Sequence, residues 1–311
     1  MQNKLKLNRN HWKHQLRNDL PLYIMLIIPL AYFIIFCYWP MFGLSIAFQN
    51  YKVGQPFFSE ASRWVGLRWF EQFLNYPFAG RLVRNTVILG VYSLAVTFPL
   101  AILLALLLNE IQHRRLKKFT TTLSFLPYFI STTVIVGMLT NFFNVNDGIV
   151  NQAIEALGGT PIDFMGSAKY FRHLYVFSGA WQTVGFNAVV FSAAIAGIDP
   201  GLYEAAYVDG STRVKNIYLI TLPCIRSTII VMFILRVGSL LNVGFEKVIL
   251  MYSERIYETA DVLSTYSYRA GILDNKWGYS TAIGLMNSVV NLILIVGANA
   301  LSRKLSETSL W

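Results

Sequence analysis

A short stretch between two long apolar runs carries residue types that suit docking against another protein. Glu204 provides a charge, and Ala205 and Ala206 are good helix formers with so little bulk that a second protein can approach their backbone. Gly210 follows, and glycine permits the positive φ at which a helix breaks. We therefore expect an elbow of two short helices joined by a turn over residues 203–223.

Start and stop signals surround this elbow. Pro200, preceded by Asp199, closes the helix before it, because proline lacks a backbone donor and disfavours helix at the residue before it. Asp209 or Ser211 can cap the second helix. That helix ends in an apolar sequence closed by proline: Ile220, Leu222 and Pro223. The alternative of an interfacial helix pair without a partner stays open on these residues alone.

One charged residue, Arg236, lies inside an otherwise uncharged run. A charge at the centre of a bilayer costs about 3 kcal/mol or more, so Arg236 should face protein or a water-filled path. It either lines a path for a polar solute or pairs with carbonyls and amides such as Asn242, and the lack of an acid in the apolar runs favours pairing. Asn187, Gln182 and Asn242 are further candidates for the path, although such amides more often join helices.

Residues for enzymatic chemistry do not come together in this sequence. The histidines are His11, His14, His113 and His173, and none has a carboxylate or cysteine at ligand spacing, so no metal site is expected. The sequence lacks a phosphate-binding loop of the Gly-x-x-x-x-Gly-Lys-Ser/Thr type and a Gly-x-Ser-x-Gly nucleophile turn. An enzyme is therefore the weaker hypothesis, and a secondary transporter would require internal repeats and intramembrane carboxylates that the sequence lacks.

Long uncharged windows must position these residues. Hydrophobic residues make up 55% of the 311 residues and charged residues 14%, which indicates a membrane protein. Each window is near or above the roughly 20 residues that a helix needs to cross a bilayer core. Apart from Arg236 they are uncharged: residues 20–51, 85–109, 119–146, 174–198, 227–245 and 277–302. We expect an all-α protein with six transmembrane helices, since no window shows the alternation of a β-barrel strand.

The basic residues predict that both chain ends lie on the cytoplasmic side. Segments on the side of the N-terminus carry more lysine and arginine than the opposite segments, as cytoplasmic loops do. We expect residues 1–20 and 303–311 to be cytoplasmic tails and residues 21–302 to be the membrane domain. The net charge of +10 collects where anionic lipid attracts it, so no nucleic-acid partner is expected.

The segments on the opposite side have structure of their own in this interpretation. Trp69, Phe70 and Phe73 recur at helical spacing, which predicts a helix lying in the headgroup zone. Residues 145–173 and 246–276 have mixed charge and turn signals, and they could receive a soluble partner.

The elbow also has a specific resemblance. Its pattern is Glu-Ala-Ala, three residues, Gly, nine residues and Ile-x-Leu-Pro, and it matches from Glu204 to Pro223 without a gap. This spacing resembles the coupling motif of permease subunits of binding-protein-dependent ABC importers. Nearly the whole chain is similar to the carbohydrate branch, most closely the polysaccharide-type (LplB-like) permeases. Supporting stretches are residues 64–67, 85–86, 125–128, 147–151, 193–200 and 299–311.

The resemblance implies a fold and a set of partners. It implies the type I importer permease fold in a bacterial cytoplasmic membrane, paired with a second permease subunit as a heterodimer. Two ATPase subunits would bind ATP and magnesium, so this chain would need no cofactor of its own. An extracytoplasmic sugar-binding protein would deliver an oligosaccharide, although an importer for a non-sugar solute is the nearest alternative.

The resemblance also implies roles for individual residues. Glu204 would contact the ATPase, Ala205 and Ala206 would allow close seating, and Gly210 would set the bend. The rest of the motif would complete the coupling contact: Asp209, Ile220, Leu222 and Pro223. If Arg236 lines the path, it would bind sugar hydroxyls or an acidic sugar.

Overall fold

The computed structural model describes residues 19–56 and 63–306. Over these residues the chain is helical, with one isolated antiparallel bridge between Gln49 and Trp64 and no strand. The all-α class is therefore confirmed. Most of the expected tail at residues 1–20, and part of the tail at 303–311, lie outside the described residues.

Six apolar spans can be traced in the described part, but three of them are bent. Helices long and apolar enough to cross a membrane on their own cover Leu20–Phe48, Ala79–Glu110 and Trp277–Lys304. Three helix pairs pass the same test only together, across bends of 93°, 69° and 64°: Arg114–Phe129 with Thr132–Phe142, Ala168–Ala196 with Pro200–Val208, and Arg213–Cys224 with Arg226–Gly238. The six expected spans are present if each bent pair counts as one.

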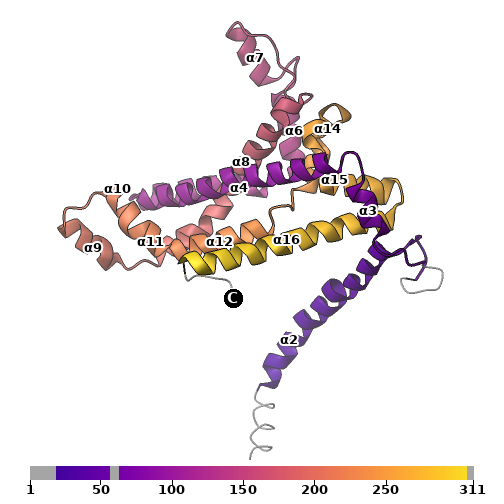
Figure 1. Ribbon diagram of the computed structural model, residues 1–311. Helices are drawn as coiled ribbons and strands as arrows, with labels where there is room; N and C mark the ends of the chain where they lie inside the picture. The colour runs from indigo at the N-terminus through magenta and orange to yellow at the C-terminus, as the bar shows by residue number, and fades with distance from the viewer. Residues whose placement is uncertain (1–18, 57–62, 307–311) are drawn as a thin grey trace, which may run out of the picture.

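Four helices make the body of the molecule: α4 (Ala79–Glu110), α8 (Ala168–Ala196), α12 (Arg226–Gly238) and α16 (Trp277–Ser306). The helix α8 packs against α4, and α12 packs against α16 (Figure 1). We call the two ends of this body the elbow end and the cap end. The elbow end carries four short elements: α9 (Pro200–Val208), α10 (Arg213–Asn216), η4 (Ile217–Thr221) and α11 (Leu222–Cys224).

The cap end carries the short helices of the opposite loops (Figure 1). They are α3 (Arg68–Leu74), α13 (Phe245–Met251), η5 (Glu254–Ile256), α14 (Tyr257–Ala260), α15 (Leu263–Tyr268) and η6 (Arg269–Leu273). The helix expected around Trp69 is present as α3, and its Phe73 is 1% exposed in a cluster with α4, α15 and α16. This part of the expectation is confirmed.

The third apolar window does not form a straight helix. It comprises α5 (Arg114–Phe125), η3 (Leu126–Phe129) and α6 (Thr132–Phe142), and α6 leads into α7 (Ile149–Ala156) away from the body (Figure 1). Pro127 lacks a backbone donor, and Ser131 then caps α6 by accepting from Val134 N at 3.4 Å. These two local signals produce the 93° bend that the apolar composition hides.

The first apolar run leans away from the rest of the chain. It comprises α2 (Leu20–Tyr32), η1 (Phe33–Tyr38) and η2 (Trp39–Phe48), and none of its most apolar window is buried. Only η2 reaches the body, where it packs against α16 and α3. The divergence is plain in Figure 1, where α2 points away from α16.

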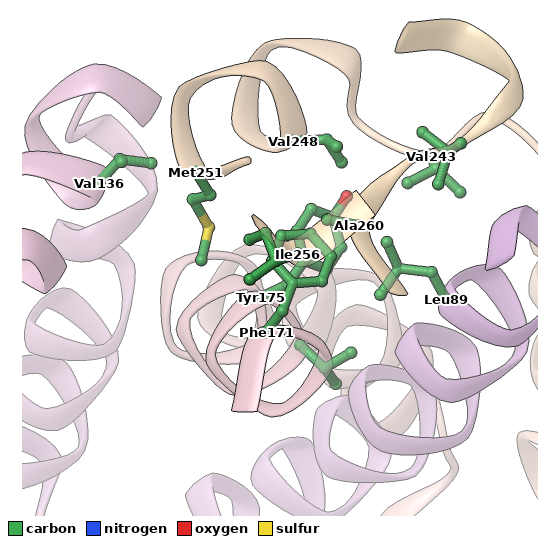
Figure 2. Packing of buried hydrophobic residues seen from close by; sticks show 11 residues of the cluster. Leu89, Val136, Phe171, Tyr175, Val243, Val248, Met251, Ile256 and Ala260 are labelled. Carbon is green, nitrogen blue, oxygen red and sulfur yellow. The ribbon is translucent and has the colours of Figure 1, made fainter. Parts of the chain in front are cut away.

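The largest buried apolar cluster lies at the cap end. Figure 2 shows Leu89 of α4, Val136 of α6 and Phe171 of α8 converging on the segment that follows α12. The helix α8 also contributes Tyr175 and Val176, and the segment after α12 contributes six residues: Val243, Val248, Met251, Ile256, Ala260 and Val262. Loops between spans therefore supply core residues here, which fixes the cap ends of α4, α6 and α8 relative to one another.

A polar network reinforces this cluster. Asn85 donates to the carbonyls of Glu258 and Asp261, at 3.0 Å each, and accepts from Arg172 at 2.9 Å. The Asp261 carboxylate, 3% exposed as a residue, forms an ion pair with Arg269 at 2.6 Å. Burial is the largest single effect and opposes the charge of Arg269, but the hydrogen bonds to Asp261 and Tyr252 and the charge of Asp261 together outweigh it and raise the pKa of Arg269 above its usual range.

Lys247 is a second buried charge at the cap end. Its side chain comes from α13, and Nζ donates to the Tyr175 carbonyl at 2.9 Å. Because the residue is only 7% exposed, burial lowers the pKa of Lys247 to about 8.

Candidate functional site

The first arm of the elbow is the helix α9. Asp199 caps it by accepting from Gly201 N at 2.9 Å, and Pro200 occupies the first helical position, where its missing donor costs nothing. Glu204 lies in the second turn and is exposed, as is Ala205. The arm buries none of its residues, and Tyr207 and Val208 are 81% and 85% exposed. An apolar and acidic surface therefore stands free at the elbow end.

Gly210 forms the bend after α9. Its φ is +71°, in the left-handed region that favours glycine, and its N–H donates to the Tyr207 carbonyl at 3.0 Å. The cap of the second arm is Thr212, which accepts from Lys215 N at 3.4 Å. The sequence suggested Asp209 or Ser211 for this cap, so that detail is wrong: Ser211 N is instead used to close α9, through the Ala206 carbonyl at 2.9 Å.

The second arm returns to the body through α10, η4 and α11. The Tyr203 hydroxyl lies 2.9 Å from Oγ1 of Thr221, which joins the two arms across the elbow. Thr221 is 2% exposed, and Ile225 is 1% exposed in a cluster with α4 and α8. Leu222 packs against the same cluster, whereas Pro223 is exposed. The elbow is thus fixed to itself and to the body while its outer face stays free.

The pair that joins the two arms, Tyr203 and Thr221, has almost no signature in the sequence. Tyr203 and Thr221 lie 18 positions apart, so no local pattern relates them. The single available signal was a hydroxyl residue between Ile220 and Leu222 in an apolar run. The exposed motif residues and the buried joining residues therefore divide the elbow into a contact face and a support.

A second candidate site lies where the fifth span is broken. The helix α12 has 13 residues, about 20 Å in length, and ends at Gly238. Arg236 lies in its last turn and donates to Oδ1 of Asn187 in α8. Residues 239–244 after it are not helical.

Amides of α16 hold this break. Nδ2 of Asn291 donates to Oδ1 of Asn242 at 3.0 Å. Oδ1 of Asn291 accepts from Leu241 N at 3.2 Å. At the other side, Gly244 N donates to the Tyr175 hydroxyl at 3.0 Å. The non-helical backbone is thus positioned by side chains from both α16 and α8.

A polar cavity of about 170 Å³ borders the break. It lies between α4, α8 and α12. Its walls are Gly90, Ser93, Leu94, Thr97, Tyr175, Arg236, Ser239, Leu240, Asn242, Val243 and Gly244.

Of the four path candidates from the sequence, the structure brings three to this region. Arg236 and Asn242 line the cavity, and Asn187 contacts Arg236. Gln182 lies elsewhere, where its Nε2 donates to the Ile130 carbonyl at the bend before α6, at 2.9 Å. The wall also contains three hydroxyl residues, Ser93, Thr97 and Ser239. The sequence did not single them out, because serine and threonine are common in apolar helices.

Metal-ligating residues are not gathered in the described part of the chain. Over residues 19–56 and 63–306, no group of three or more histidine, cysteine, aspartate or glutamate side chains is placed to hold a metal ion.

Known proteins share the sequence pattern and the fold of this chain. Residues 97–307 match the family described as binding-protein-dependent transport system inner membrane component. The chain belongs to this family. The match contains the elbow, α12 and the whole of the broken span, and it leaves out only Gly90, Ser93 and Leu94 of the cavity wall.

Individual relatives cover nearly the whole chain. Protein LplB of Bacillus subtilis is 42% identical over 96% of this chain and 94% of its own length. The polygalacturonan/rhamnogalacturonan transport system permease protein YteP of the same organism is 40% identical over 93% of this chain and 90% of its own length. These relatives confirm the resemblance to LplB-like permeases.

A solved structure has the same fold. It is a chain of a bacterial alginate ABC transporter in complex with an alginate pentasaccharide-bound periplasmic protein. It is 38% identical, covers 96% of this chain and 99% of its own, and superposes with a TM-score of 0.87. The type I permease fold is therefore confirmed.

Proposed function

We propose that this chain is a permease subunit of an ATP-driven importer that moves an oligosaccharide across the cytoplasmic membrane. It pairs with a second permease subunit and receives its substrate from an extracytoplasmic sugar-binding protein. Two ATPase subunits bind ATP and magnesium and drive the cycle. In this arrangement both chain ends and the elbow end face the cytoplasm, and the cap end faces the binding protein.

The elbow is the observation that carries the proposal. Its contact face, which includes Glu204, Ala205 and the exposed Tyr207, offers an acidic and apolar surface with little bulk near the backbone. Its support, the Tyr203–Thr221 contact and the buried Ile225, joins that face to α4 and α8. A movement of the ATPase subunits is therefore passed to the membrane helices with little lost in bending of the elbow.

The helix α12 extends this connection into the membrane. It begins at Arg226, directly after the elbow, and reaches Arg236 ten residues later, which is about 15 Å. A shift of the elbow thus repositions Arg236 and the break behind it. Alternating access follows as a two-state change, biased by nucleotide at one end and by the loaded binding protein at the other.

The saccharide class rests on the relatives. The YteP protein is described as the permease protein of a polygalacturonan/rhamnogalacturonan transport system, and the solved structure is that of an alginate transporter. Both substrates are polysaccharides, and both relatives span nearly the full length of this chain. An oligosaccharide derived from a polysaccharide is therefore the substrate class that we propose here.

Two substitutions in the elbow test the coupling. We expect Gly210→Pro and Glu204→Lys to leave the complex in the membrane but to abolish saccharide-stimulated ATP hydrolysis. Proline cannot adopt the φ of +71° at Gly210, so the contact face is displaced, and lysine reverses the charge on that face. Gly54→Pro is the matched control, because Gly54 also has a positive φ, +89°, but lies in the loop after the first span. Full transport in either elbow variant would contradict the coupling assignment.

A further inference from the structure

The fifth span is interrupted inside the helical body. At the break, Leu241 is hydrogen-bonded to Asn291, which lies near the middle of the 30-residue helix α16. Backbone without helical hydrogen bonds at membrane depth is tolerated only where protein covers it or where it lines a water-filled cavity. Here it borders the polar cavity of about 170 Å³. The break therefore exposes polar groups to this cavity.

Arg236 has no compensating negative charge at this place. Its partner is the neutral amide of Asn187, and no carboxylate of the described residues forms an ion pair with it. The C-terminal end of α12 supplies only a partial negative charge. One hydrogen bond leaves most of the five guanidinium N–H donors available to a ligand. A structural arginine in a membrane would be expected to have a fuller set of partners.

We propose that this break holds a binding site for the carboxylate of an acidic sugar, with Arg236 as the group that binds it. The inference rests on the proposed function and names the substrate class within it: oligosaccharides that contain uronic acids. A guanidinium binds a carboxylate through two parallel hydrogen bonds, and a neutral sugar hydroxyl cannot replace both.

The cavity has the size and lining that such a site requires. Its volume of about 170 Å³ corresponds to about six water molecules at roughly 30 Å³ each, so it holds an acid group and not a sugar chain. Ser93, Thr97 and Ser239 in the wall offer hydroxyl oxygens that can accept from sugar hydroxyls next to the acid group. Asn242 is held by Asn291, so this part of the wall is fixed before the ligand arrives.

The test compares an acidic and a neutral sugar in the assembled transporter. The probes are trigalacturonate and the same trisaccharide with its carboxylates reduced to alcohols. Uptake is measured in proteoliposomes that contain the complete complex, at equal amounts of assembled protein, with the binding protein supplied. The affinity of the binding protein for each probe is measured separately, so that its own preference is divided out.

Three arginine variants give the comparison. In Arg236→Gln we expect KM for uptake of trigalacturonate to rise about 10- to 100-fold, as for the loss of a charge-assisted hydrogen bond, and uptake of the reduced probe to change less than about twofold. Arg236→Lys keeps the charge and should retain most of the preference for the acid. Arg115→Gln, at an exposed arginine of α5, is the control and should behave as the wild type.

The possible failures are distinguishable. Equal loss of both probes in Arg236→Gln, no loss of either, or failure of this variant to assemble would overturn the carboxylate site and leave the importer function standing. If the wild-type complex takes up neither probe and no other oligosaccharide, the proposed function is overturned, and this inference with it.

Discussion

The contact between α4 and the broken span gives a sharp prediction for Gly90→Ala. Gly90 lies inside α4, and a Cβ added there would lie 2.2 Å from the Leu240 carbonyl oxygen and 3.2 Å from its carbonyl carbon. Real Cβ atoms essentially never come closer than 3.0 Å, so the backbone must move by at least 3.0 − 2.2 = 0.8 Å. A backbone carbonyl, unlike the end of a flexible side chain, cannot turn aside.

The magnitude follows from what the displaced backbone holds. Overpacking of a well-packed interior costs about 1–3 kcal/mol. Leu241 N, the next donor along the chain, is bound to Asn291 at 3.2 Å, and loss of this hydrogen bond adds about 1 kcal/mol. We therefore expect Gly90→Ala to lower the stability of the protein by about 2–4 kcal/mol.

The assay measures the thermal midpoint of the detergent-solubilised complex. The midpoint is obtained from the amount of assembled protein that remains after heating to each temperature. We expect a fall on the order of 5–10 °C. Gly80→Ala is the matched control on the same helix, because an added Cβ there meets nothing within 4 Å. Equal midpoints for Gly90→Ala and Gly80→Ala would refute the close approach of α4 to the break.

Two further predictions concern the cap end. Asp261→Asn removes the partner of Arg269 and should destabilise the protein by about 3 kcal/mol, near the lower end for buried pairs because the arginine side chain keeps 22% exposure. Asp274→Asn, in the exposed 3.4 Å pair with Lys276, should change stability by less than about 1 kcal/mol, and equal thermal shifts in the two variants would contradict this. Burial lowers the pKa of Lys247 from 10.5 in the unfolded chain to about 8 in the folded protein. Between these two pH values the unfolded chain binds more protons than the folded protein, so the contribution of Lys247 makes stability rise with pH from about 8 to 10.5. Lys247→Met should lose that rise in thermal midpoint, whereas parallel pH profiles of variant and wild type would refute the shift.

Much of the elbow could be predicted from the sequence because its signals are local. Asp199 and Pro200 start α9 where expected, and Gly210 has the positive φ that the turn requires. These residues act on backbone within a few positions of themselves. The contact between Tyr203 and Thr221 is different in kind, since it depends on how the two arms close on each other.

The bends of the apolar windows were harder to predict. Hydrophobic composition reports that a segment suits lipid, and it does not report whether the segment is straight. Pro127 and Ser131 together turn the third window by 93°, although each residue is tolerated in a straight membrane helix. In the same way, no local signal showed that the chain after Gly238 leaves the helix, because its hydrogen bonds go to α16 and α8.

The polar site was visible only in part. Arg236 was identifiable because a charge in an apolar run is rare, and the two interpretations left open by the sequence depended on its partners. The structure gives Asn187 as its partner, while Asn242, the partner suggested by the sequence, is bound by Asn291. Gly90 carried no such signal, since a glycine in a membrane helix is common and its close contact with Leu240 is a property of the packing.

The most direct test of the central claim is ATP-dependent uptake by the reconstituted complex. Labelled oligosaccharides from acidic and neutral polysaccharides are offered to proteoliposomes with the binding protein on one side and ATP at the ATPase subunits on the other. We predict accumulation of an oligosaccharide against its gradient, together with stimulated ATP hydrolysis, and loss of both in Gly210→Pro. Accumulation without ATP, or accumulation that persists unchanged in Gly210→Pro, would contradict the account.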